Sequence, residues 1–143
     1  MIEYAVKDSS SIADIRHLWE ELNEHHISKG SFSEIYLART FEHRRSELME
    51  KCKESMRIFT AFEDSIPVAY CIASPGEIES LCVSKKYRGS GIGKKLMEFV
   101  LEWMEELGTK NIVVEVYGGN EGVIDFYSGL GFSTRKIIME RRV

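Results

Sequence analysis

Several features that would assign this chain to a special class of protein are rare or missing. Its 143 residues include only two prolines, and they contain no repeat, no low-complexity segment and no linker rich in Pro, Gly or Ser. No apolar run approaches the roughly 20 residues that a transmembrane helix needs. The N-terminus lacks the basic and apolar regions of a signal peptide. We therefore expect a cytoplasmic protein without a membrane partner.

Excess positive charge and paired cysteines are missing too. The chain has 19 Lys and Arg against 23 Asp and Glu, a net charge of −4, so nothing suggests a nucleic-acid partner. Its three cysteines, Cys52, Cys71 and Cys82, share no metal spacing, which predicts reduced thiols that pack as small buried hydrophobes. The pair His25-His26 has no third ligand at a suitable spacing. We expect no metal site, and a solvated or substrate-facing role for these histidines.

The chain does contain enough apolar material for a core. Hydrophobic residues make up 43% of the sequence, and its length fits one domain of ordinary size. We therefore expect a single domain that covers residues 1–143.

A strand pattern, a glycine-rich turn and a helix pattern follow one another in residues 77–108. Residues 77–83 are mostly β-branched and apolar, and after the turn apolar residues recur at helical spacing until Gly108. The N–H groups of such a turn and of the helix start point the same way, with the positive end of the helix dipole behind them. This arrangement predicts a phosphate-binding site.

The spacing of the glycines decides which phosphate ligand fits. A dinucleotide-binding turn needs glycine where this sequence has Lys94, and a nucleoside-triphosphate loop needs Ser or Thr where it has Lys95. The pattern that remains is Arg88-x-x-Gly91-x-Gly93. The two lysines fall in the first helical turn, where each cation opposes the dipole by about 0.3–1 kcal/mol. They favour a bound anion over a turn that merely connects strand and helix.

Hydrophobic periodicity predicts the secondary structure of the rest of the chain. Strands are expected at residues 2–7, 57–63, 67–73, 77–83 and 111–117, with one or more closing strands in residues 132–142. Helices are expected from a capping box at Ser11 to Gly30, from Thr40 to Lys53, from the glycine-rich turn to Gly108, and from about Gly122 to Gly129, with a connection at 31–38. The second helix should bury Phe41, Leu48, Cys52 and the stem of Arg45. The strand at 111–117 follows that at 77–83 through a helix, so these two should be parallel and the preceding strands antiparallel.

The pattern Arg88-x-x-Gly91-x-Gly93 resembles the acetyl-coenzyme A signature of the GCN5-related N-acetyltransferases. A second family motif resembles Asn120, followed by Phe126-Tyr127 and Gly131-Phe132, at the usual separation from the first. With the element order β-α-α-β-β-β-α-β-α-β, the resemblance covers nearly the whole chain. It implies an α/β (α+β) fold in which about four helices flank a central mixed, mostly antiparallel sheet with one parallel pair. Residues 133–136 are too short for the hairpin with which many relatives end, which leaves the acceptor site open.

The resemblance also implies where acetyl-coenzyme A (acetyl-CoA) lies. The acetyl-pantetheine arm would pair with the backbone of Leu81, Cys82 and Val83, and an amide of Leu81 or Cys82 would polarise the thioester carbonyl. Asn120 would meet the pantetheine, and Tyr127 matches the family's general acid. The pyrophosphate would contact the loop residues Arg88, Gly89, Ser90, Gly91, Ile92, Gly93 and Lys94. Gly91→Val is expected to block this contact and to leave the fold intact.

The implied reaction is direct attack of an amine on the thioester in a ternary complex. At pH 7 a lysine-like amine of pKa ~10.4 costs about 4.6 kcal/mol to deprotonate, and an α-amine of pKa ~7.8 costs about 1 kcal/mol. Glu77 and Glu79 share a strand face and are candidate bases, although a solvated strand edge explains them equally well. Glu115 interrupts an apolar run and is our first choice.

The acceptor stays open between a peptide or protein N-terminus, a polyamine and an aminoglycoside-like amino sugar. Clustered acids in the cleft are expected to attract a cationic amine. The alternative function is a non-catalytic acyl-CoA sensor or interaction module on the same fold, against which the presence of Tyr127 and Glu115 argues. A homodimer and acyl groups other than acetyl also stay open.

Overall fold

Five strands form one mixed sheet in the order β1-β2-β3-β4-β5 within the part of the chain that is described. The computed structural model describes residues 1–142, with Ser33 described by its backbone alone. The strands are β1 (Ile2–Lys7), β2 (Arg57–Glu63), β3 (Ile66–Ser74), β4 (Glu77–Val83) and β5 (Val113–Val114). The first four pair antiparallel, and β5 runs parallel to β4. The predicted fold class is confirmed, and so are the bounds of β1, β2 and β4.

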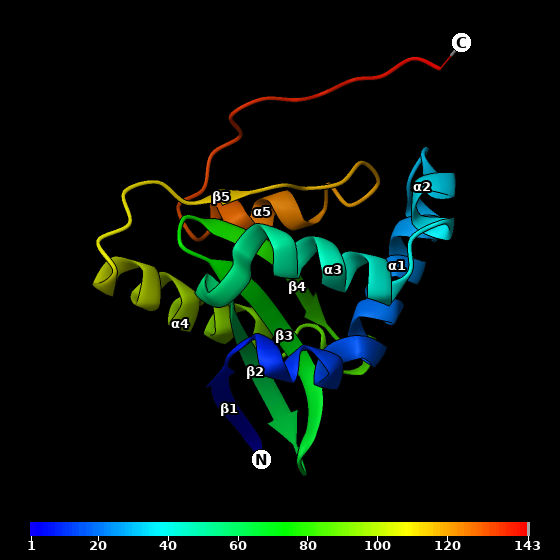
Figure 1. Cartoon of the computed structure of the whole chain (residues 1–143). Coiled ribbons are helices and arrows are strands. Elements are labelled where there is room, and N and C mark those ends of the chain that lie inside the picture. The colour runs from blue at the N-terminus through cyan, green and yellow to red at the C-terminus, as the bar shows by residue number, and fades with distance from the viewer. Residues whose placement is uncertain (143) are drawn as a thin grey trace.

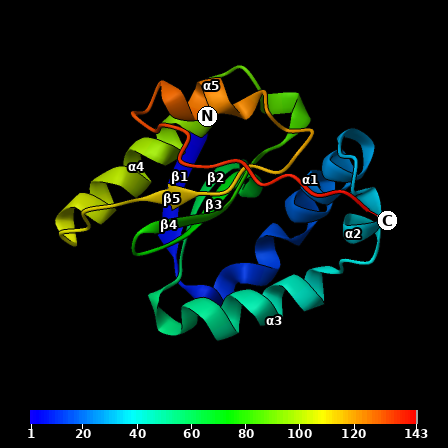
Figure 2. The same ribbon diagram turned by 90° about the horizontal axis from the view of Figure 1, so that it is seen from above.

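Helices cover both faces of the sheet. They are α1 (Arg16–Lys29), α2 (Ser33–Leu37), α3 (Phe41–Cys52), α4 (Ile92–Glu106) and α5 (Val123–Ser128), with short 3-10 helices η1 (Ser9–Ile15), η2 (Lys53–Ser55) and η3 (Lys85–Tyr87). Figures 1 and 2 show α4 and α5 on one side of the sheet and α1 and α3 on the other. Each side has its own core, one around Leu96 and Met97 of α4 and the other around Leu18 of α1 and Leu48 of α3.

The first helical segment begins earlier than predicted. The carboxylate of Asp8, not a capping box at Ser11, accepts a hydrogen bond from the Ser10 amide at 3.0 Å. An aspartate can cap the free amides of a helix start as serine does, so the chain turns into η1 here before α1 begins. Thr40 caps α3 as predicted, with its hydroxyl accepting from the His43 amide at 3.1 Å. Residues 31–38, expected to be a connection, include the short helix α2.

The buried face of α3 differs from the prediction by one arginine. Phe41, Leu48 and Cys52 are buried as expected. Arg45 is exposed and pairs with Glu42 at 3.6 Å, whereas Arg44 is half-buried. Both arginines flank the apolar stripe of α3. Arg44 lies on the side that faces β4, where its guanidinium donates a hydrogen bond to the Glu79 carbonyl.

A β-bulge in β4 explains why β5 is so short. Ser80 pairs with Ile72 and Ile78 pairs with Ala73, so Glu79 is an extra residue in the ladder. A bulge bends its strand and ends regular pairing. Accordingly β5 pairs with β4 only at Glu77 and Ile78, and the strand predicted at 111–117 is wrong in its extent. Beyond Ile78 and Val114, the segments that continue from β4 and β5 no longer pair.

The closing strand predicted in residues 132–142 is also wrong. This segment forms no strand, and Ile137, Ile138 and Met139 are 80%, 80% and 91% exposed. The segment runs from α5 towards α2 (Figure 2), where the Arg142 guanidinium lies 4.0 Å over the Phe32 ring and pairs with Glu34. The edge offered by β5 is only 2 residues long, so few ladder hydrogen bonds compete with these contacts.

Within residues 1–142, no helix combines the length and the apolar character needed to cross a membrane.

Candidate active site

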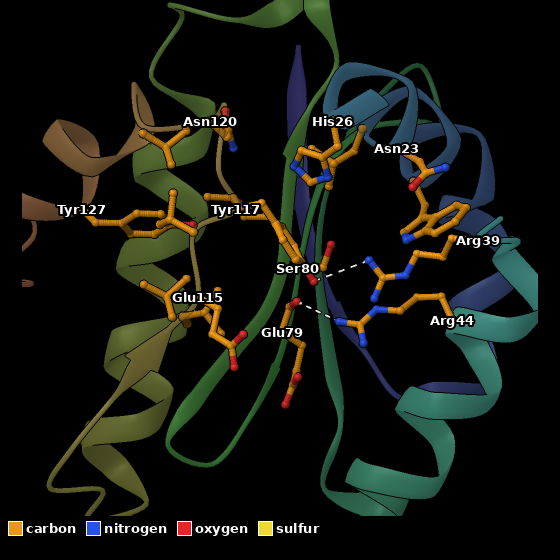
Figure 3. Close-up of a pocket in the computed structure, with 17 residues that line it drawn as sticks. Asn23, His26, Arg39, Arg44, Glu79, Ser80, Glu115, Tyr117, Asn120 and Tyr127 are labelled. Carbon is orange, nitrogen blue, oxygen red and sulfur yellow. Dashed lines mark hydrogen bonds between the residues drawn. The ribbon is translucent and has the colours of Figure 1, made fainter. Parts of the chain in front are cut away.

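A cleft of about 90 Å³ lies where β4 and β5 separate (Figure 3). Its walls come from β4, α1 and the start of α3 on one side, and from the segment between β5 and α5 on the other. Five of the predicted site residues line it: Glu79, Leu81, Glu115, Asn120 and Tyr127. Of the other predicted residues, Glu77 begins β4 beside β5 and Cys82 and Val83 end it. The rest belong to the glycine-rich loop and the start of α4.

Tyr127 reaches the cleft from α5. Its ring packs against Phe126 and Phe132, with centroids 5.2 and 5.5 Å away, and the residue is only 7% exposed. Burial raises the pKa of its phenol, and the nearby Cys71 thiol raises it further. No hydrogen bond joins its hydroxyl to another described residue, and Figure 3 shows the ring directed into the cleft. Tyr127 therefore presents a neutral phenol.

The glycine-rich loop and the start of α4 leave backbone N–H groups open. Gly89 and Gly91 have φ angles of +78° and +86°, and Gly91 is the N-cap of α4 without a side-chain cap. The first hydrogen bond of the helix runs from the Lys95 amide to the Gly91 carbonyl at 3.0 Å. The amides of Ile92, Gly93 and Lys94 precede it, and such amides are satisfied by an anion or by water.

The conformation of Gly91 corrects one expectation. Gly91→Val would strain the backbone of the loop, because a β-branched residue is disfavoured at positive φ, and it therefore does not test the phosphate contact alone. Gly93 is needed for a different reason, since a Cβ there would lie 3.3 Å from the Val83 side chain. Arg88 is turned back onto the end of β4, with Nε donating to the Val83 carbonyl at 3.1 Å and Nη2 lying 3.7 Å from Glu21.

Glu77 and Glu79 share a face of β4, and one lysine holds both. Lys51 Nζ donates to Glu77 at 2.8 Å and to Glu79 at 2.9 Å. Ser74 donates to the other oxygen of Glu79 at 2.9 Å, and the Glu79 side chain is 2% exposed. Burial alone would lower the pKa of Lys51, but the two carboxylates outweigh it and raise that pKa. Of the clustered acids expected to attract a cationic amine, these two therefore already share an internal cation.

Glu115 differs from both. It follows β5 directly, is exposed and lines the cleft. No hydrogen bond or ion pair joins its carboxylate to the rest of residues 1–142. The wall that continues from β5 thus presents a carboxylate that is available to a ligand.

A family model described as the Acetyltransferase (GNAT) family matches residues 15–132, which span the cleft and the glycine-rich loop. The chain belongs to this family. N-alpha-acetyltransferase 30 of Schizosaccharomyces pombe is 33% identical over 101 residues, 71% of this chain and 67% of that protein. N-alpha-acetyltransferase 30 of Saccharomyces cerevisiae is 36% identical over 61 residues, 43% of this chain and 35% of that protein. A solved structure of a Bacillus halodurans protein has a TM-score of 0.77 at 21% identity, and covers 100% of this chain and 99% of that chain.

These relationships make the protein an N-acetyltransferase enzyme. Members of the family use acetyl-CoA as the acetyl donor. Among the described residues, no group of His, Cys, Asp and Glu side chains is arranged to hold a metal ion.

The cysteines of this acetyltransferase are buried and form no disulfide among the described residues. Cys82 faces α1 and donates from Sγ to the Leu18 carbonyl at 3.3 Å. Burial, with the nearby Glu21 charge, raises the pKa of its thiol to about 12. A thiol in this state is a poor nucleophile, which argues against an acetyl-cysteine intermediate.

Sequence reasoning missed the aromatic wall of the cleft. His26 and Tyr117 line the cleft and pack with Tyr36 behind them, with ring centroids 5.1 to 5.4 Å apart. Burial, helped by the His25 and Arg39 charges, lowers the pKa of His26 to about 4, so its ring is neutral at pH 7. The pair His25-His26 was the available signal, but the two tyrosines come from segments far apart in the sequence.

Two arginines of the cleft, Arg39 and Arg44, were missed as well. In the sequence alone, each looks like an ordinary solvent-exposed cation of a polar segment. Figure 3 shows both guanidinium groups directed into the cleft from the side of α3.

Proposed function

We propose that this acetyltransferase transfers the acetyl group of acetyl-CoA directly to a primary amine in a ternary complex. The observation that carries the proposal is the separation of β4 and β5 after Ile78. Beyond it, the edge of β4 that includes Leu81 has no strand partner in residues 1–142 and borders a cleft with Tyr127 on its other side. An extended pantetheine arm can pair with such an edge as a missing strand would.

The loop after β4 then supports the phosphate end of the donor. Residues Gly89 to Lys94 offer open amides at the positive end of the α4 dipole, and Lys94 is an exposed cation beside them. Asn120, at the cleft wall next to α5, would bond the pantetheine. An amide of Leu81 or Cys82 would polarise the thioester carbonyl as the charge on its oxygen develops.

We assign proton transfer to Glu115 and Tyr127, which line the cleft and whose polar atoms have no hydrogen-bond partner among the described residues. Glu115 would accept the proton of the incoming ammonium, directly or through a water molecule. Tyr127 would stabilise the departing thiolate. A phenol of pKa ~10 is a weaker acid than a thiol of pKa ~8.5, and burial raises the pKa of Tyr127 further. A hydrogen bond to the thiolate is therefore favoured over complete proton transfer.

An α-amine is the acceptor that this site supports best. Two relatives are named N-alpha-acetyltransferase 30. An α-amine also loses its proton at pH 7 for about 1 kcal/mol, against about 4.6 kcal/mol for a lysine side chain. Glu77 and Glu79 are paired with Lys51, so Glu115 is the carboxylate left to accept a proton. One such base suits the small deprotonation cost of an α-amine better than the larger cost of a lysine side chain.

A thiol-release assay tests the proposal. The protein is given acetyl-CoA together with short peptides that have free N-termini, free amino acids, amino sugars or spermidine. We expect coenzyme A release that depends on at least one amine, with α-amines ahead of spermidine, whose primary amines are alkyl amines like that of a lysine side chain. Binding of acetyl-CoA without release in any mixture would reject the proposal and identify a non-catalytic acyl-CoA sensor.

Lys94→Glu tests the role of the loop in donor binding. The change adds a favourable charge to the first turn of α4, so the free energy of unfolding should rise by about 0.3–1 kcal/mol. The affinity for acetyl-CoA should nevertheless fall by roughly 10-fold, because a phosphate contact is lost and repulsion replaces it. Calorimetry and denaturant unfolding measure the two effects. Lys110→Glu, which lies beyond the C-terminal end of α4, is the control and should leave the affinity unchanged. Equal affinity in the Lys94 variant would remove Lys94 from the site.

A further inference from the structure

We propose that the acceptor carries a carboxylate or a phosphate a few bonds from its amine, and that Arg39 and Arg44 bind this anion. The inference rests on the proposed function, because it names the class of amine that the same cleft takes.

The two arginines enter the cleft from neighbouring positions. Arg44 lies in α3 and donates from Nη2 to the backbone carbonyl of Glu79 at 3.1 Å. Arg39 lies between α2 and α3, and its side chain is only 18% exposed. Its Nη1 donates to the Tyr117 hydroxyl at 3.4 Å. Both guanidinium groups are thus positioned by contacts with opposite walls of the cleft.

Neither arginine donates a hydrogen bond to a carboxylate among residues 1–142. Arg44 makes the single hydrogen bond to the Glu79 carbonyl, and the ion pair of Arg39 with Glu47 spans 3.8 Å. A guanidinium carries several N–H donors in a planar fork that matches the oxygens of a carboxylate or phosphate. Two partly buried guanidinium groups with spare donors favour an anion supplied by a ligand.

The balance of charge around the cleft points the same way. The Glu79 carboxylate is bound by Lys51 and Ser74. That leaves Glu115 as the free carboxylate of the cleft within the described chain, facing two arginines. The lining residues carry two positive and two negative charges, and because the Glu79 carboxylate is bound by Lys51 and Ser74, the arginine side of the cleft is where an anionic group is attracted.

The positions of the two signs orient the acceptor. The arginines come from the side of α3, whereas Glu115 follows β5 on the other wall (Figure 3). An acceptor whose anion contacts the arginines would direct its amine across the cleft, towards Glu115 and the gap between β4 and β5. That gap is where the proposed function places the thioester.

The test compares acceptors in pairs whose members differ in their anion. The pairs are Glu-Ala-Ala amide and Gln-Ala-Ala amide, β-alanine and β-alanine amide, and glucosamine 6-phosphate and glucosamine. We expect kcat/KM to favour the anionic member of the accepted pair by roughly 10-fold, the effect of a charge-assisted hydrogen bond. The three pairs distinguish a peptide, an amino acid and a sugar phosphate as the source of the anion.

Variants of the arginines separate charge from structure. Arg44→Met and Arg39→Met should each reduce the preference for the anionic member towards 1. Arg44→Lys keeps the charge and should retain part of the preference for the anionic member. If Arg44 only supported β4, the charge of residue 44 would not affect this preference. Arg45→Met is the matched control, because Arg45 is exposed on the same helix and pairs with Glu42; it should keep the full preference.

Calorimetry of the same pairs adds a readout that does not need turnover. Turnover with equal use of both members, or with spermidine preferred, would overturn this inference and leave the proposed function standing. Selective binding of the anionic members that is lost in Arg44→Met, without turnover of any amine, would support the anion site and reject the proposed function. If neither turnover nor selective binding is seen, both are wrong.

Discussion

Glu115→Gln is expected to lower turnover by about 10²–10⁴-fold, the usual range for losing a positioned base. The change is nearly isosteric, and Glu115 has no protein partner within residues 1–142, so folding should be unaffected. What disappears is the acceptor for the ammonium proton. Single-turnover rates with saturating acetyl-CoA measure the effect without interference from product release.

The pH dependence of this loss is the sharper part of the prediction. An α-amine of pKa ~7.8 is already neutral above pH 8, so the deficit of the variant should shrink between pH 6.5 and 9. With a lysine-like amine the deficit should persist over the same range. Glu98→Gln, on the exposed side of α4, is the control for loss of one negative charge. Wild-type rates across this range would transfer the role to Glu77 or Glu79, acting from within their pair with Lys51.

Tyr127→Phe should lower turnover by about 10²-fold and leave the affinity for acetyl-CoA nearly unchanged. Phenylalanine preserves the packing against Phe126 and Phe132 and removes only the hydroxyl. The free energy of unfolding should therefore stay close to that of the wild type. Tyr4→Phe, on the far edge of the sheet, is the matched control.

A leaving-group series distinguishes a chemical role of Tyr127 from a packing role. If the hydroxyl stabilises the departing thiolate, the defect should diminish with acetyl donors whose thiols are more acidic, because these need less help to leave. A defect of constant size across the series, or unchanged turnover when chemistry limits the rate, would reduce Tyr127 to a packing residue.

The local patterns of the sequence predicted most of the fold, including the glycine-rich loop and the helix that the proposed donor site uses. β1, β2 and β4 have the predicted bounds because alternation of apolar residues depends on near neighbours alone. The glycine-rich loop follows from the same short range, since the positive φ of Gly89 and Gly91 is needed wherever the chain turns so tightly into a helix. The placement of Asn120 and Tyr127 beside one cleft could also be anticipated, because their motif includes its own helix, α5.

Tertiary structure decided the acceptor side. The bulge at Glu79 depends on the register between β3 and β4, and it determines that β5 ends after two residues. The pairing of Lys51 with Glu79 joins residues 28 apart, and the bond from Arg44 to the Glu79 carbonyl joins residues 35 apart. Helical periodicity does not say which of Arg44 and Arg45 turns towards a strand, and a charge pattern does not say which glutamates are already paired. These contacts form only when separate elements pack together, and they determine which charges remain free to meet the acceptor.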